Sequence, residues 1–145
     1  MEEAEGFSIR KELRITQELG RKVAREYPEF VNGLVAFDKA GMASGALPRK
    51  TKELIAVALS VVKECVYCIG WHVRAALREG ATKDEIMEAA FVGCVLGGGP
   101  AWMYVKLVYK AIEELEPEVK PKPSKSEYTR ARKRAPHGAG EDACD

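Results

Sequence analysis

Residues 50–85 read KTKELIAVALSVVKECVYCIGWHVRAALREGATKDE and hold three helical signals in succession. Residues 50–63 carry an apolar face that is too wide for a helix exposed on one side, so we expect a central, mostly buried helix there. Residues 65–79 repeat with a helical period, and Gly80 follows where a left-handed residue ends a helix. Residues 82–85 form a capping box, which marks the next helix start. The pattern predicts three consecutive helices.

The sequence before this stretch is also helical in pattern. Apolar residues recur at helical intervals over residues 8–30, with charged residues between them. Tyr27-Pro28 is expected to interrupt that run, because proline can begin a helix but cannot continue one. A second helix is expected over residues 30–42, followed by a loop at residues 44–48.

A glycine-rich break, Gly97-Gly98-Gly99-Pro100, separates the last two predicted helices. The first of these runs from the capping box to about Leu96, and the second covers residues 101–115. The break falls inside the longest uncharged stretch, residues 89–105, and would interrupt a membrane-spanning helix there. Nothing in the sequence reads as a strand. We therefore predict an all-α helical bundle formed by residues 1–115.

Length and composition limit the classes of function. A chain of 145 residues fits one domain with a core of ordinary size. It has 23 Lys and Arg against 22 Asp and Glu, which gives no overall field for nucleic acid or an anionic membrane. No secretory signal is evident, so we expect a cytoplasmic protein. In a reducing cytosol, a close cysteine pair is more often catalytic or metal-binding than structural.

The character of the sequence changes after residue 115. Three prolines follow in close succession, and residues 120–134 hold seven basic residues against Glu127 alone. We predict that residues 116–145 form a disordered basic tail, which acts as a solvated linker. Cys144 lies in this tail and has no evident partner.

Two cysteines stand at the start of one predicted helix. In a helical first turn, Cys65 and Cys68 are close enough to form a disulfide with little rearrangement. A helix N-terminus also favours thiolate over thiol. His72 follows Cys68 by four residues, so its imidazole lies on the same face and can accept the thiol proton. The spacing indicates a redox pair with an activated nucleophile.

Glu53 is a charged residue in a segment that otherwise favours burial. A buried carboxylate needs a partner. The returning helix can bring His72 or the thiols to it, and such a pairing would tune proton transfer. We therefore add Glu53 to the candidate site.

The spacing of these residues resembles the alkylhydroperoxidase D pattern, which belongs to the carboxymuconolactone decarboxylase superfamily. The order is Glu53, eleven residues, Cys65, two residues, Cys68, three residues and His72. Residues 78–86 resemble the helix-turn-helix that follows the active-site helix in that family, and the break at residues 97–101 is similar too. The resemblance covers about residues 47–115.

The resemblance implies an all-α bundle that assembles as a homotrimer or homohexamer and reduces hydroperoxides through its thiols. By that resemblance Cys68 attacks the peroxide, Cys65 resolves the sulfenic acid to a disulfide, and Glu53 and His72 form the proton relay. The implied substrate is a small hydroperoxide or disulfide, and the reductant is a dithiol or a thiol protein. We expect no cofactor and no resident metal.

One position departs from the family pattern, and further functions remain open. The family has a second histidine between the cysteines, where this chain has Tyr67, which can support the site as a hydrogen-bond donor but is a poor base near neutral pH. The cysteines, His72 and Glu53 could instead bind zinc. The chain could also be a carbon–carbon lyase of the carboxymuconolactone decarboxylase type, which does not depend on a cysteine pair, or a non-catalytic helical module.

Overall fold

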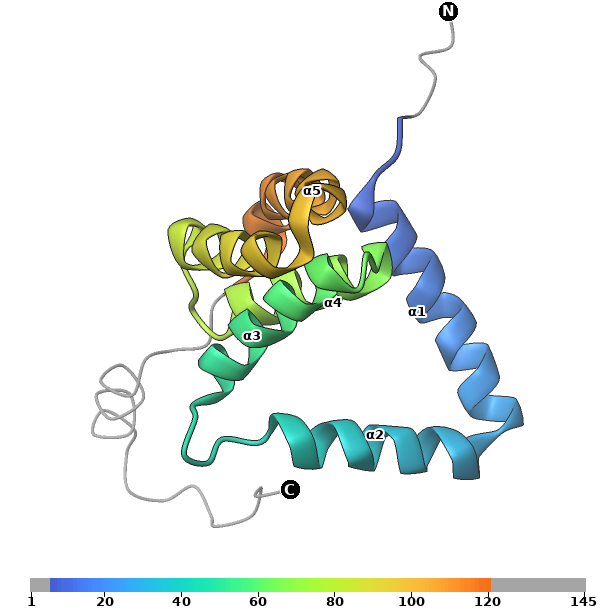
Figure 1. Cartoon of the computed structure of the whole chain (residues 1–145). Coiled ribbons are helices and arrows are strands. Elements are labelled where there is room, and N and C mark those ends of the chain that lie inside the picture. The colour runs from blue at the N-terminus through green and yellow to red at the C-terminus, as the bar shows by residue number, and fades with distance from the viewer. Residues whose placement is uncertain (1–5, 121–145) are drawn as a thin grey trace, which may run out of the picture.

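The computed structural model of the chain describes residues 6–120 and contains only helices within them (Figure 1). The prediction of an all-α fold is therefore confirmed. In chain order the elements are α1 (Ile9–Glu26), α2 (Pro28–Met42), α3 (Arg49–Val62), α4 (Val66–Arg78), α5 (Lys83–Leu115) and a short 3-10 helix, η1 (Glu116–Glu118). Cys144 and most of the predicted tail, residues 121–145, lie outside the described residues.

Local signals place the helix ends where the sequence predicts them. α1 ends at Glu26 and α2 begins at Pro28, two residues before the predicted start at residue 30, so the proline itself starts the new helix. Gly80 follows α4 with φ 82°, the left-handed conformation that glycine adopts most easily. At the start of α5, Thr82 Oγ1 accepts a hydrogen bond from the Glu85 amide, and the Glu85 carboxylate accepts one from the Thr82 amide.

Lys50 joins the start of α3 to the start of α5. Its Nζ lies 2.7 Å from Glu85 Oε1. The hydrogen bond from Lys50, followed by the one from the Thr82 backbone, lowers the pKa of Glu85 below its usual value. The same glutamate therefore caps α5 and contacts α3.

α3, α4 and α5 pack against one another and form the core (Figure 1). α5 is kinked, because Gly98 has non-helical backbone angles and Pro100 follows it, so the predicted break at the glycine-rich segment is present. The kink lets both halves of α5 pack on the bundle. The largest buried apolar side chains of the three helices are Val57, Val61, Ile69, Val73, Ile86, Val105, Val108 and Ile112.

The kink in α5 matters for whether this helix could cross a membrane. Residues Lys83–Glu118 are long and apolar enough to cross a membrane by length and composition alone. The chain does not run straight through them, however, because of the kink at Gly98. Val105, Val108 and Ile112 of the second half are buried in the same core as α3 and α4. The second half of this segment therefore packs into the core of the bundle, while Val92, Val95 and Leu96 of the first half are exposed.

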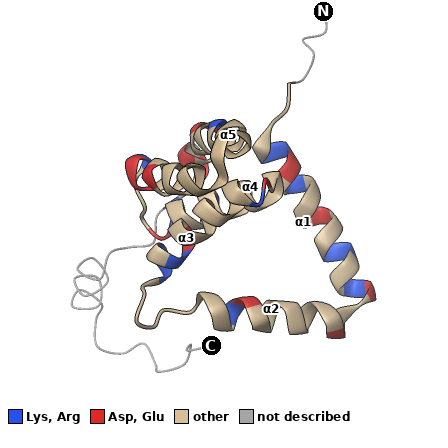
Figure 2. Cartoon of the chain, viewed as in Figure 1, with Lys and Arg blue, Asp and Glu red and all other residues tan. Residues whose placement is uncertain are grey.

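α1 and α2 form an arm that leaves the bundle. Only Ile9 and Leu13, at the start of α1, are buried, and they pack over Gly70 of α4. The rest of α1 leads away, and α2 runs back toward α3 at a distance from the bundle (Figure 1). α2 has no buried residue and few charges (Figure 2). Its exposed large side chains are Phe30, Leu34, Val35 and Phe37.

The prediction that α3 is mostly buried is wrong for the single chain. Ile55, Leu59 and Val62 are 45%, 57% and 39% exposed. α4 and α5 pack on one side of α3, and the arm does not cover the other side. The wide apolar face that the sequence shows thus divides into a buried half and an exposed half. Exposed apolar patches of this kind mark interaction surfaces.

We expect Gly93→Ala to destabilise the bundle by about 1–3 kcal/mol, because a Cβ at Gly93 would lie 2.5 Å from the carbonyl oxygen of Ala58 where α5 crosses α3. Gly20→Ala on exposed α1 is the matched control, where the new methyl group meets nothing. That control should stabilise the protein by roughly 0.5–1 kcal/mol. Urea unfolding at equal protein concentration measures both changes. A neutral Gly93→Ala would contradict the close crossing.

Candidate active site

A tight connection joins α3 to α4 and places the first cysteine. The Glu64 amide donates to the Val61 carbonyl at 3.2 Å, and the Cys65 amide donates to the Ser60 carbonyl at 3.1 Å. These two bonds end α3 as a Schellman motif, with Glu64 in the left-handed conformation at φ 55°. Cys65 closes this motif and is also the N-cap of α4. One residue thus ends the first helix and begins the next.

The two cysteines meet in the first turn of α4. Cys65 Sγ accepts a hydrogen bond from the Cys68 amide at 3.2 Å. The predicted disulfide between Cys65 and Cys68 is present, with the two Cα atoms 5.2 Å apart, inside the ordinary range for such bonds. Both residues are half-buried. The pair is therefore held at a helix N-terminus with a backbone N–H directed at sulfur.

Glu53 and His72 form a hydrogen-bonded pair between α3 and α4. The Glu53 side chain is 2% exposed, and its Oε2 lies 2.8 Å from His72 Nδ1. Because an ionised carboxylate can only accept, we assign the proton of this bond to Nδ1. The neutral imidazole then carries its free lone pair on Nε2, the atom that can act as a base. The carboxylate thus fixes both the ring orientation and the tautomer.

Arg49 completes the coordination of the buried carboxylate. Its Nη2 and Nε lie 3.2 and 3.3 Å from Glu53 Oε1, and its Nε is also 3.7 Å from Glu79 Oε1. Each oxygen of Glu53 therefore has a cationic or donor partner, which offsets the cost of burying it. Arg49 is not among the residues predicted from the sequence, although its position four residues before Glu53 is the usual spacing for a helical ion pair.

His72 lies one helical turn after Cys68 on α4. Among residues 6–120, no hydrogen bond joins its imidazole to either sulfur. This is expected for the disulfide, since neither sulfur carries a proton to donate. The structure thus joins the four predicted residues as two pairs, Cys65 with Cys68 and Glu53 with His72, on one helix and its neighbour.

The model of the carboxymuconolactone decarboxylase family matches residues 28–111, which include all four of these residues. The chain belongs to the carboxymuconolactone decarboxylase family. Two uncharacterised proteins are similar in sequence: one from the cox locus of Paracoccus denitrificans, 39% identical over 59% of this chain and 77% of its own length, and one from Cupriavidus necator, 46% identical over 53% and 68%.

Solved structures of carboxymuconolactone decarboxylase family proteins share the fold. The apo form of one from Legionella pneumophila is 40% identical with a TM-score of 0.67, and the match covers 71% of this chain and 91% of that one. One from Thermotoga maritima, described as having a suspected part in the antioxidative response, is 32% identical with a TM-score of 0.65 over 74% and 91%.

The remaining candidate residues make fewer interactions than the two pairs do. Tyr67, which stands where the alkylhydroperoxidase D pattern has a histidine, is 54% exposed and makes no hydrogen bond through its side chain within residues 6–120. Cys94 is a half-buried free thiol packed against the core. In the described part of the chain, no three His, Cys, Asp or Glu side chains are arranged to hold a metal ion.

We expect Arg49→Gln to lower the free energy of unfolding by about 1–3 kcal/mol, because Glu53 Oε1 would lose its charged partner while still buried. Lys63→Gln, at the C-cap of the same helix, removes an equal charge from an exposed position and should change stability by no more than about 0.5 kcal/mol. Denaturant unfolding measures both variants. Equal stabilities would mean that Arg49 does not compensate the buried carboxylate.

Proposed function

We propose that this protein is a thiol-dependent peroxidase of the alkylhydroperoxidase D type. The observation that carries the proposal is that a single helix, α4, holds both a cysteine pair at its N-terminus and an imidazole oriented by a buried carboxylate. Thiol chemistry needs a sulfur that ionises and a group that moves its proton, and this arrangement supplies both.

In the oxidative half-reaction, the Cys68 proton passes to His72 Nε2, and the thiolate attacks one oxygen of the hydroperoxide. The O–O bond breaks, the alcohol leaves with the proton from the imidazolium, and Cys68 becomes a sulfenic acid. Cys65 then attacks the Cys68 sulfur and expels water, which forms the disulfide. Throughout these steps the Glu53 carboxylate stabilises the positive imidazolium.

A dithiol reductant closes the cycle. It supplies two electrons and two protons, so that one hydroperoxide yields one alcohol and one water per turn. The reductant is a small dithiol or a thiol protein, and the substrate is a small hydroperoxide or disulfide. Since such reductants belong to the cytosol, we place the protein in the cytoplasm. The suspected antioxidative part of the Thermotoga maritima relative is consistent with this proposal.

We also propose that the protein works as a homotrimer or homohexamer, held together by apolar helix faces. The arm helix α2 and the outer face of α3 both expose large apolar side chains, and α5 adds Val92, Val95 and Leu96 before its kink. A monomer would leave all of these in water, at a cost of about 25 cal/mol for each Å².

A lyase of the carboxymuconolactone decarboxylase type is the second candidate function within the family. It does not depend on a cysteine pair. The disulfide at the start of α4 therefore favours the thiol peroxidase.

The wild-type protein should consume cumene hydroperoxide with dithiothreitol, and Cys68→Ser should reduce consumption to the uncatalysed rate. Cys65→Ser, reduced, freed of dithiothreitol and then treated with the hydroperoxide, should accumulate a sulfenic acid on Cys68 that dimedone traps, because the resolving thiol is gone. Cys94→Ser is the control and should keep full activity. Undiminished turnover by Cys68→Ser would refute the proposal.

Removing either member of the relay should slow alkylation of Cys68 in the reduced protein by roughly tenfold at pH 7, since less of the thiol is ionised. His72→Gln and Glu53→Gln test this by peptide-resolved mass spectrometry with iodoacetamide. The loss should shrink as the pH rises toward the ordinary thiol pKa of about 8.5. The double variant should slow alkylation of Cys68 little more than either single variant does, because the two residues act as one unit.

Glu64→Gln is the matched control for the relay, since Glu64 is an exposed glutamate next to the cysteines. It removes the same charge without touching the imidazole and should not slow alkylation. Parental rates for both single variants at pH 7 would contradict the relay and leave a plain redox pair.

Substituting the arm should dissociate the assembly. Phe30→Glu with Phe37→Glu places charges at side chains that are 74% and 78% exposed in the single chain, and we expect the variant to sediment as a smaller species than the full-length parent. Thr16→Glu, on the exposed part of α1, is the control and should leave the assembly intact. If the full-length parent is a monomer at micromolar concentration, the proposal of a homo-oligomer is wrong.

A further inference from the structure

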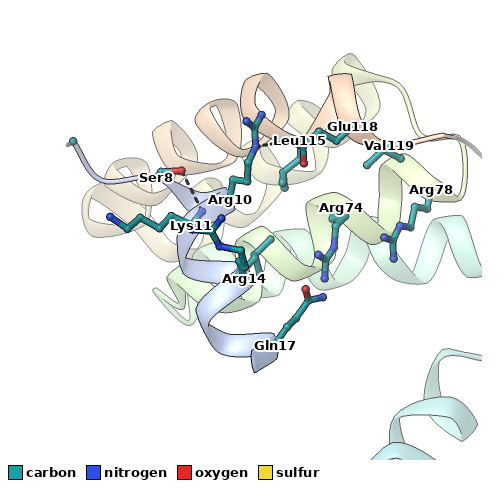
Figure 3. A pocket seen from close by; sticks show the side chains of 12 residues that line it. Ser8, Arg10, Lys11, Arg14, Gln17, Arg74, Arg78, Leu115, Glu118 and Val119 are labelled. Atoms are coloured by element: carbon teal, nitrogen blue, oxygen red, sulfur yellow. Dashed lines mark hydrogen bonds and ion pairs between the residues drawn. The ribbon is translucent and has the colours of Figure 1, made fainter. Parts of the chain in front are cut away.

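A cavity of about 740 Å³ lies where the start of α1, the end of α4 and the end of α5 meet (Figure 3). This volume is within the range of small-molecule sites, about 300–1,000 Å³. One part of its lining is apolar and consists of Leu13, Leu115 and Val119. The remainder is dominated by cationic side chains, so the cavity combines apolar surface with concentrated positive charge.

The charge in this cavity is not balanced by its own carboxylate. Arg10, Lys11, Arg14, Arg74 and Arg78 line it together with Glu118. Glu118 is engaged by Arg10, whose Nε lies 2.9 Å from Glu118 Oε1 (Figure 3). Within residues 6–120, no ion pair joins Arg14, Arg74 or Arg78 to any carboxylate. Three guanidinium groups therefore line the cavity without an ion-pair partner among residues 6–120.

Arg74 is held in place although its charge is unfavourable there. The Gln17 amide oxygen, in the orientation that its surroundings require, accepts from Nη1 and Nη2 of Arg74 at 3.1 and 2.7 Å. The Trp71 ring also lies 5.3 Å from Arg74 Cζ. Burial, and then the charge of Arg78 one turn away, lower the pKa of Arg74. An anion between the two arginines would relieve this repulsion.

We propose that this cavity is a binding site for a small organic anion. Arg14, Arg74 and Arg78 hold its carboxylate or phosphate group, because the guanidinium fork matches both groups with paired hydrogen bonds. The apolar part of the ligand rests on Leu13, Leu115 and Val119. The site lies beyond the proposed peroxidase centre, since neither cysteine of the disulfide nor His72 lines the cavity.

The proposed anion site lies near the Glu53–His72 relay but is lined by neither of those two residues. A smaller cavity of about 300 Å³ shares Gln17, Arg74 and Arg78 with the first and is also lined by Arg49. Arg49 is the partner of the buried Glu53. A ligand bound at Arg74 and Arg78 would therefore lie near Arg49, which is itself paired with Glu53.

Isothermal titration of the full-length protein with hexyl phosphate, hexanoate and 1-hexanol tests the proposal. At least one of the two anions should bind in a saturable way at one site per chain, and the tighter one identifies the acidic group. The neutral alcohol should bind at least about tenfold more weakly, because it lacks the charged group. Binding requires no thiol turnover, so this result is independent of the peroxidase proposal.

Arg74→Gln with Arg78→Gln should weaken the binding of the anion by about tenfold or more. Arg21→Gln with Arg25→Gln removes the same charge from the exposed end of α1 and is the matched control, which should bind as the parent does. If the first variant does not fold, Arg14→Gln alone should still weaken binding about tenfold. The proposal is overturned by no binding of either anion up to about 10 mM, by hexanol binding as tightly as the anions, or by equal affinities in the arginine and control variants.

Discussion

The burial of the Glu53 carboxylate is the constraint on which the site depends. A charge removed from water costs several kcal/mol unless partners satisfy it. Here Arg49 holds one oxygen and His72 the other. The partners come from α3 and α4, so the two helices are restricted to the register in which both contacts form. The same contact orients the imidazole along the helix that carries the thiols. A structural requirement and a chemical one are thus met by one side chain.

Much of the fold follows from chemistry that operates over a few residues. Pro28, Gly80 and the Thr82 capping box each set a helix boundary through the dihedral angles or hydrogen bonds of their own segment, so the sequence predicts them directly. The pairing of Glu53 with His72 could also be predicted from the sequence, because only one tight connection separates the two helices that carry these residues. The resemblance to the alkylhydroperoxidase D pattern then indicated a reaction for these residues, the reduction of hydroperoxides.

Features that depend on distant parts of the chain could not be predicted in this way. Ser8 and Arg10 contact Glu114, more than 100 positions away, and both of them line the cavity that we propose as the anion site. Burial opposes a lower pKa for Glu114, but the hydrogen bonds from Arg10, Lys110 and Ser8 outweigh it and keep the pKa low. The direction in which α2 leaves the bundle is likewise a tertiary property. It leaves uncovered the half of the apolar face of α3 that α4 and α5 do not bury, and no local pattern encodes it.

The connection of three residues between α3 and α4 also bears on how the chain folds. Arg49, Glu53, the cysteines and His72 all lie in one helical hairpin, so bringing them together closes only short loops, which carry a small entropic cost. Contacts of low sequence separation form early and rapidly. The docking of Ile9 and Leu13 onto α4, in contrast, closes a loop that includes the whole of α2 and α3. On these grounds we expect the reactive hairpin to form before the N-terminal arm docks onto it.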